Sequence, residues 1–137
     1  MGKPVLEELD RAECLRLVAG SAVGRVAFDD GEGPAIIPVN YVLDGDTLVF
    51  RTTVGGRLTK NLSTHLAGAE MRIAFEVDRL DTDDRTGWSV LLRGGARPMT
   101  EQEAAAAPDP DPWPAGERES LIVFTPNEVS GRRLHRD

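Results

Sequence analysis

The sequence has few of the side chains on which disulfides, metal sites and catalytic triads depend. It contains one cysteine, Cys14, and two histidines, His65 and His135. One cysteine cannot form an internal disulfide, and two histidines so far apart offer no metal-ligand spacing. There is also no G-x-S-x-G motif for a nucleophilic serine. We therefore expect no metal and no catalytic side chain, and we interpret Cys14 as a small core residue of a helix.

Positive charge and long apolar runs are also scarce. The chain has 16 Lys and Arg against 23 Asp and Glu, a formal net charge of -7, so its surface as a whole would repel nucleic acids and anionic membranes. We interpret the basic cluster GRRLHR at residues 131–136 as surface charge at the end of the chain rather than as a nucleic-acid site. No run approaches the roughly 20 apolar residues of a membrane span, and no signal-peptide pattern is present. We expect a cytoplasmic protein with neither a nucleic-acid nor a membrane partner.

Three short helices are predicted, two from capping signals and one from periodicity. Asp10 followed by Glu13, with Gly20 as a stop, marks the first helix. Thr100 and Glu103 mark another in the same way. Between them, leucines recur at helical spacing and predict a short amphipathic helix over one end of a sheet: Leu58, Leu62 and Leu66.

Most of the remaining chain has the alternation and the β-branched and aromatic content of strands. Six strands are predicted, at residues 22–30, 34–46, 47–53, 70–78, 88–99 and 120–129. Asp44 and Gly45 predict a tight hairpin, and Asp29 to Gly33 a looser one. Strands that follow one another with brief helical interruptions predict an antiparallel barrel or sandwich with helical covers. With 40% hydrophobic residues, the 137-residue chain suffices for one core, so we expect a single domain over residues 1–137.

The segment FRTTVGGRLTKNL, residues 50–62, carries the chemistry of a phosphate site. It leads from a strand through the hydroxyls of Thr52 and Thr53 and a Gly-Gly pair into the second predicted helix. Glycine amides and a helix N-terminus attract anions, Arg57 can bind phosphate oxygens with its guanidinium, and Lys60 could add a second charge. The alternative is a plain strand-to-helix turn with solvated cations, because the segment is neither a Walker loop nor a dinucleotide fingerprint.

Several blocks, in their order and spacing, resemble the pyridoxamine 5'-phosphate oxidase-like family, the flavin-binding split-barrel proteins. The resemblance spans roughly residues 5–134 and is closest to the small bacterial branch that includes nitroimidazole-resistance-like proteins. It rests on VGRVAF, IPVNYVLDGDTLVFRTTVGGRL, IAFEVD, GWSVLLRGGA and PNEVSGRRL. It implies a mainly β fold, a split antiparallel β-barrel with a few short covering helices. It also implies a homodimer, with FMN or a related flavin in each of two clefts between the subunits.

The resemblance further implies which residues contact the flavin. The phosphate-contacting segment falls on Arg51, Thr52, Thr53 and Arg57. The contacts along the flavin ring fall on Pro38, Val39, Asn40 and Tyr41 of one strand and on Trp88 and Ser89 of a later one. Larger oxidases have an Arg-Lys pair where this chain has Arg57 and Leu58, so one cation is missing unless Lys60 replaces it. They also have a longer C-terminal region that holds pyridoxamine phosphate, which argues against vitamin B6 oxidation here.

Some of these side chains have a second interpretation. Trp88 suits a barrel core as well as a ring contact. Asn40 and Tyr41 lie on opposite faces of their strand, so without a bulge only one of them can face a given ligand. Glu76 and Asp78 share a face two residues apart. They could serve as an acid pair, but we interpret them as solvated or arginine-paired because no histidine or metal ligand is nearby.

From the resemblance we expect an FMN-dependent oxidoreductase of unknown substrate, in which the flavin carries the electrons and no side chain acts as a nucleophile. The substrate would stack on the exposed flavin face near Trp88 or Tyr41. Two alternatives stay open. One is a reductase that uses the deazaflavin coenzyme F-420, and the other is a non-catalytic flavin- or haem-binding protein.

Overall fold

The computed structural model describes residues 2–53, 70–111 and 118–136, apart from the side chains of residues 52–53 and 118–120. Within these ranges the chain is mostly antiparallel sheet with two short helices, α1 (Arg11–Ala19) and α3 (Glu101–Ala106). The strands are β1 (Val5–Leu9), β2 (Val23–Asp29), β3 (Pro34–Asp44), β4 (Thr47–Thr53), β5 (Met71–Asp81), β6 (Thr86–Pro98) and β7 (Arg118–His135).

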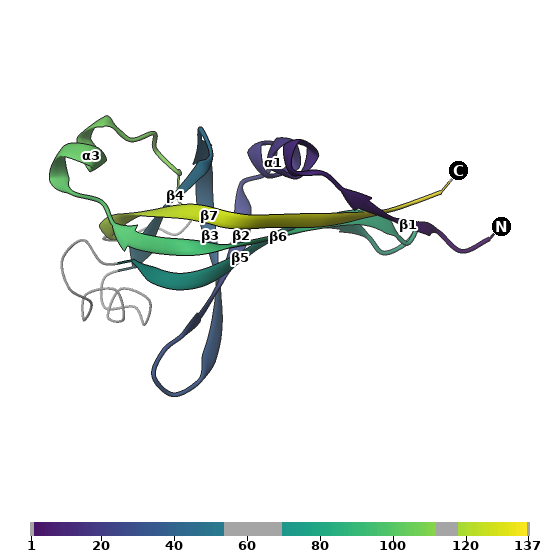
Figure 1. Cartoon of the computed structure of the whole chain (residues 1–137), viewed down its shortest axis with the longest axis horizontal. Helices are drawn as coiled ribbons and strands as arrows, with labels where there is room; N and C mark the ends of the chain where they lie inside the picture. The colour runs from purple at the N-terminus through teal and green to yellow at the C-terminus, as the bar shows by residue number, and fades with distance from the viewer. Residues whose placement is uncertain (1, 54–69, 112–117, 137) are drawn as a thin grey trace.

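The sheet closes on itself, which confirms the predicted split antiparallel barrel. The strand order is β1-β7-β4-β3-β2-β5-β6, and a further β6–β7 pairing joins the two sides. The long strand β7 pairs with β6 along one side, while along the other it pairs first with β4 and then with β1. Figure 1 shows β5, β6 and β7 running along the long axis, with α1 beside β7 and the β2–β3 hairpin projecting away from these strands.

The start of α1 follows from a local capping contact. The Asp10 carboxylate accepts a hydrogen bond from the Glu13 backbone N–H at 2.9 Å, and the helix stops at Gly20, as predicted. The Glu13 carboxylate binds Arg16 on the same helix and Arg133 on β7, the latter at 3.0 Å. This second contact fixes the helix against the sheet.

The start of α3 is also the predicted capping box. The Thr100 hydroxyl accepts from the Glu103 N–H at 3.1 Å, and the Glu103 carboxylate accepts from the Thr100 N–H at 2.9 Å. The same carboxylate accepts two hydrogen bonds from Arg97 on β6, both at 2.8 Å. The helix is therefore tied to the strand that precedes it.

Both predicted hairpins are present. Asp44 lies opposite Thr47, and Gly45 has φ +62, the backbone conformation that a tight primed turn needs. In the looser turn after β2, the Asp29 carboxylate accepts from the Gly31 N–H at 2.8 Å. This turn leads directly into β3, so β2 and β3 form a continuous arm.

Two parts of the strand prediction are wrong. The strand β1 was not predicted, and β7 continues to His135 instead of ending at residue 129. The basic cluster 131–136 therefore lies mostly inside a strand, where Glu7 and Glu8 of β1 face Arg133 and Arg132 of β7. Opposite charges facing each other across a strand pair are favourable, but neither strand alternates apolar with polar residues. The predicted helix with Leu58, Leu62 and Leu66 lies outside the described residues.

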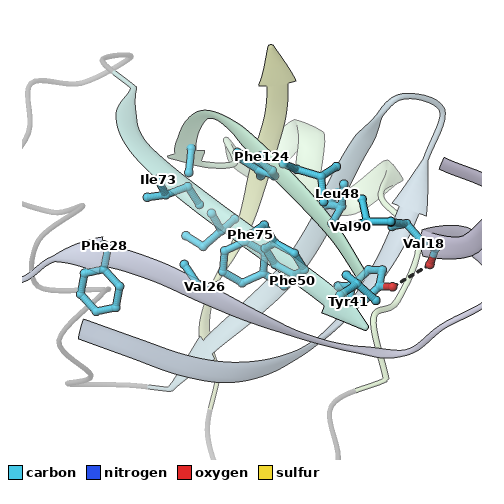
Figure 2. Close-up of a cluster of buried hydrophobic side chains, with 14 of the residues drawn as sticks. Val18, Val26, Phe28, Tyr41, Leu48, Phe50, Ile73, Phe75, Val90 and Phe124 are labelled. Atoms are coloured by element: carbon cyan, nitrogen blue, oxygen red, sulfur yellow. Dashed lines mark hydrogen bonds between the residues drawn. The ribbon is translucent and has the colours of Figure 1, made fainter. Parts of the chain in front are cut away.

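The core is built around the ring of Phe75, which is fully buried. Figure 2 shows it beside Phe50, with Tyr41 and Phe124 nearby. The ring centroids lie 5.3, 5.9 and 6.0 Å from those of Tyr41, Phe50 and Phe124. A Cβ at Gly24 on β2 would lie 2.2 Å from Phe75 Cε1. The ring therefore requires glycine at this position of β2.

Candidate functional site

The alternation of β3 separates the predicted ring-contact residues into two groups. Val39 and Tyr41 face inward, since Val39 packs against the core and Tyr41 belongs to it. Pro38 and Asn40 face outward. Asn40 is nevertheless 8% exposed, and its amide donates a hydrogen bond to the Ala22 carbonyl at 3.3 Å. Of these four residues, only Pro38 therefore has an exposed side chain.

The neighbouring strand β4 alternates in the same way. Phe50 lies opposite Tyr41 in the register, and both side chains are in the core. Asn40 and Arg51 are the next residues beyond this pair on their two strands, and Arg51 is half-buried. By strand alternation, Asn40 and Arg51 therefore both point to the side of the sheet opposite to this core pair.

The side chain of Tyr41 is used by the fold. It is 3% exposed, and its hydroxyl donates a 2.6 Å hydrogen bond to the Val18 carbonyl of α1 (Figure 2). Burial raises the pKa of the phenol well above its ordinary value, although a hydrogen bond with Ser21 opposes this. The ring is not open to a substrate, which corrects the expectation of stacking near Tyr41. Contact of a cofactor with its backbone stays a prediction.

The two predicted residues of β6 also divide between the faces. Trp88 is half-buried and packs against the core, which agrees with its interpretation as a barrel-core residue. Its contact with a flavin ring stays a prediction. Ser89 faces outward and lines a surface hollow of about 590 Å³. Its neighbours there include Glu8 of β1 and Arg132 of β7.

The predicted phosphate site is described only in part. The backbone of Thr52 and Thr53 belongs to β4, but their side chains are not described. Arg57 and Lys60 lie outside the described residues. The assignment of these four residues and Arg51 to a phosphate stays a prediction.

A second hollow, of about 240 Å³, lies between the β2–β3 arm and the strands β5 and β6. We call it the outer groove and define it by its eight lining residues: Arg25, Ala27, Ile36, Ala74, Phe75, Glu76, Asp78 and Leu91. Leu91 also lines the hollow beside Ser89, so the two hollows lie next to each other. The register places Pro38 directly opposite Arg25, so the predicted ring-contact strand forms the edge of the outer groove.

Two carboxylates and one guanidinium lie in this groove. Arg25 approaches the Glu76 carboxylate to 3.4 Å and the Asp78 carboxylate to 3.7 Å, which confirms the arginine-paired interpretation. The pKa of Glu76 is raised to about 7, first by burial and then by the hydrogen bond and charge of Asp78, while Arg25 opposes these effects. Arg25 was not predicted as a site residue. Its outward position could be inferred from the alternation in VGRVAF, but its pairing with β5 could not.

Few other described residues could take part in catalysis or metal binding. Cys14 is fully buried, which agrees with its interpretation as a core residue. Burial raises the pKa of its thiol, and the negative charges of Asp10 and Glu13 also raise it. Among residues 2–53, 70–111 and 118–136, no group of three or more His, Cys, Asp or Glu could hold a metal ion. No helix in the part that the structure describes is long and apolar enough to cross a membrane.

Comparison with known proteins gives the family. The family model described as pyridoxamine 5'-phosphate oxidase matches residues 10–133. The chain belongs to this family. The uncharacterized protein Rv0080 of Mycobacterium tuberculosis is 36% identical over 135 residues, which covers 95% of this chain and 86% of that protein.

Solved structures of other proteins have the same fold. A Corynebacterium glutamicum protein named after pyridoxamine 5'-phosphate oxidase is 27% identical, with a TM-score of 0.80 over 96% of this chain and 100% of its own. The FAD binding protein of Mycobacterium smegmatis is 26% identical, with a TM-score of 0.70 over 94% of this chain and 98% of its own. A Bacteroides thetaiotaomicron protein named for 5-nitroimidazole antibiotic resistance shares the fold at 15% identity, with a TM-score of 0.62 over 99% of this chain and 94% of its own.

Proposed function

We propose that this protein is a flavin-dependent oxidoreductase that holds FMN on the outer surface of β3 and β4. The observation that carries the proposal is the exposed Pro38, which lies opposite Arg25 at the edge of an open groove, on the side of the sheet to which Asn40 and Arg51 also point. The family membership supports the same assignment. A bound flavin would supply two-electron transfer to or from a small organic substrate.

The residues available fit a flavin in chemical terms. Pro38 offers an apolar surface on which a ring system can lie, and Asn40 offers an amide for polar ring atoms. Arg51 carries a positive charge at the end of the barrel from which the glycine-rich segment departs, and Arg57 and Lys60 would extend this charge toward a phosphate. In this arrangement the protein binds and orients the flavin, and no side chain is asked to form a covalent bond.

The proposed site takes residues from two chains of a homodimer. Arg51 lies opposite Leu121 of β7, whereas Ser89 lies opposite Arg132 of the same strand. Eleven residues (132 − 121) of extended strand at about 3.3 Å each span about 36 Å, too far for one FMN to contact both. A flavin held by Arg51 of one chain can meet Trp88 and Ser89 only if these come from a second chain. A single domain over residues 1–137 and a cytoplasmic location complete the proposal.

The experiment is a flavin titration with a charge-reversal variant. Purified protein is examined by absorbance and fluorescence and titrated separately with FMN, FAD, the deazaflavin coenzyme F-420 and haem. We expect tight binding of FMN, and we expect Arg57→Glu to abolish it without lowering the unfolding midpoint. Arg11→Glu, on the exposed side of α1, makes the same charge change as a control and should bind flavin normally. Unchanged flavin content in R57E would reject the phosphate assignment, and a folded dimer that binds no flavin would reject the oxidoreductase.

FAD is a second candidate cofactor. The observation in its favour is the 26% identity with the FAD binding protein of Mycobacterium smegmatis, over nearly the whole of both chains. The titration separates the two cofactors directly, because FAD carries an additional adenosine phosphate that FMN lacks. Preference for F-420 or haem would select one of the remaining alternatives.

A further inference from the structure

The outward face that contains the outer groove carries large apolar side chains that are exposed in the single chain. Ile36, Leu6 and Leu80 are 66%, 58% and 65% exposed, and they are three of the four large apolar side chains exposed among the described residues. The strand registers place all three on the same outward side of the sheet as Glu76. Large apolar side chains that are exposed on one face indicate a surface that another molecule covers.

The shape of this surface suits a second copy of the chain. The β2–β3 arm projects away from β5, β6 and β7 (Figure 1), and its residues Arg25, Ala27 and Ile36 line the groove. An arm next to a groove is self-complementary, because a two-fold axis places each arm against the other groove. The outward surface from β3 to β1 contains six strands. The five spacings between them, at roughly 4.8 Å each, make it about 24 Å wide across the strands. This is the scale of a standard interface of about 800 Å² per partner.

Charge opposes such an association unless the groove takes up a proton. Each chain has a formal net charge of -7, so two chains repel. In the groove, Glu76 and Asp78 present two carboxylates to one guanidinium, that of Arg25. Covering the groove removes water from the excess negative charge, and an uncompensated buried charge is strongly unfavourable.

Among the described residues, the outward cations on β6 and β7 nearest to the pair each lie opposite another carboxylate. On β3 the facing residues are Ile36 and Pro38, and on β6 they are Ser89, Leu91 and Arg93. Arg93 lies directly opposite Glu128 of β7. Arg132 of β7 lies directly opposite Glu8 of β1. The excess carboxylate therefore remains at Glu76 and Asp78.

We propose that a second copy of this chain covers the outer groove and that the Glu76–Asp78 pair takes up a proton when the dimer forms. The affinity of the two chains for each other then rises as the pH falls from 8 to 6. The inference rests on the homodimer of the proposed function and adds its regulation by pH. The proton replaces the missing positive charge, and each protonated pair with Arg25 is neutral.

The size of the effect follows from proton linkage. The pKa of Glu76 in the single chain is about 7, so the fraction of chains already protonated is about one in eleven at pH 8 and about ten in eleven at pH 6. If the covered pair stays protonated throughout, each chain contributes about a tenfold change between these pH values. A symmetrical dimer with two such pairs should then show about a 100-fold lower dissociation constant at pH 6 than at pH 8.

The test is sedimentation equilibrium of the full chain at pH 6, 7 and 8. Glu76→Gln imitates the protonated acid, so its dimer should have the wild-type pH 6 affinity at every pH. Asp78→Asn removes the second carboxylate and should shift the pH dependence to lower pH. Glu101→Gln, on α3, makes the same chemical change as E76Q and should behave like wild type. His135→Gln removes the histidine beside Glu7 and should also keep the pH dependence.

The outcomes separate this inference from the homodimer itself. A dimer whose dissociation constant does not change between pH 6 and 8, or changes equally in E76Q, overturns the proton-linked association and leaves the homodimer standing. A chain that stays monomeric at every pH and concentration overturns both. A pH dependence that disappears in H135Q and persists in E76Q assigns the proton to His135 and also overturns the inference.

Discussion

The contact between Gly24 and Phe75 makes a prediction that can be worked out from the structure. Gly24 does not have a positive φ, so alanine is compatible with the backbone. The added Cβ would, however, lie 2.2 Å from Cε1 and 2.8 Å from Cζ of Phe75. The ring cannot easily move aside, because Tyr41, Phe50 and Phe124 surround it. The substitution Gly24→Ala should therefore overpack the core.

The expected magnitude is the difference of two effects. Overpacking a well-packed core destabilises by about 1–3 kcal/mol. Replacing glycine by alanine in a strand recovers about 0.5–1 kcal/mol of conformational entropy. We expect G24A to lower the free energy of unfolding by about 1–2 kcal/mol. This is a large share of the roughly 5–15 kcal/mol of a typical domain.

The assay is urea unfolding at one fixed protein concentration, arranged as a double-mutant cycle with Phe75→Leu. F75L removes the ring atoms that the new methyl group meets, at a loss of about 1–2 kcal/mol by itself. In the F75L background, G24A should be neutral or stabilising by up to about 1 kcal/mol. Gly20→Ala is the control, because its Cβ would lie 3.7 Å from the nearest atoms, the Arg16 and Leu17 carbonyl oxygens. An equal effect of G24A in both backgrounds would refute the steric argument.

Three further predictions concern local contacts. Tyr41→Phe should lower the free energy of unfolding by about 1–2 kcal/mol, because the Val18 carbonyl loses its buried donor; an unchanged urea midpoint would contradict this. Thr100→Ala should lower it by about 0.5–2 kcal/mol through loss of the α3 cap, and the loss should be visible as faster amide exchange in α3. The contacts with Arg16 and then Arg133 lower the pKa of Glu13 from 4.5 to about 2, so their stabilisation is present above pH 4.5 and lost as the pH falls toward 2. Acid titrations of wild type and Glu13→Gln should converge in that window, and parallel curves would show that Glu13 is not responsible.

The predicted site shows where sequence reasoning reaches its limit. The alternation of β3 correctly separates Asn40 from Tyr41, because side-chain direction in a strand is a local property. Which of the two faces the core is not local, and Tyr41 is inside because its hydroxyl reaches the Val18 carbonyl of α1. Trp88 had two interpretations for the same reason, since an aromatic residue at a strand start suits either face.

The sequence by itself determined the elements whose signals lie within a few residues. The caps at Asp10 and Thr100, the turn at Gly45 and the strand alternation all act over short distances, and all are present in the structure. The family, too, could be recognised from the order of its blocks and is confirmed by the match over residues 10–133.

Only the tertiary structure decided which distant residues meet. Arg25 and Glu76 are 51 positions apart in the chain, and Glu13 and Arg133 are 120 apart. β1 and the end of β7 are strands because each supplies the other's hydrogen bonds and opposite charges, although neither has the alternation of an independent strand. Pairing between distant strands depends on register, and register is set by the closed barrel as a whole. The outer groove and its carboxylate pair therefore depend on this register.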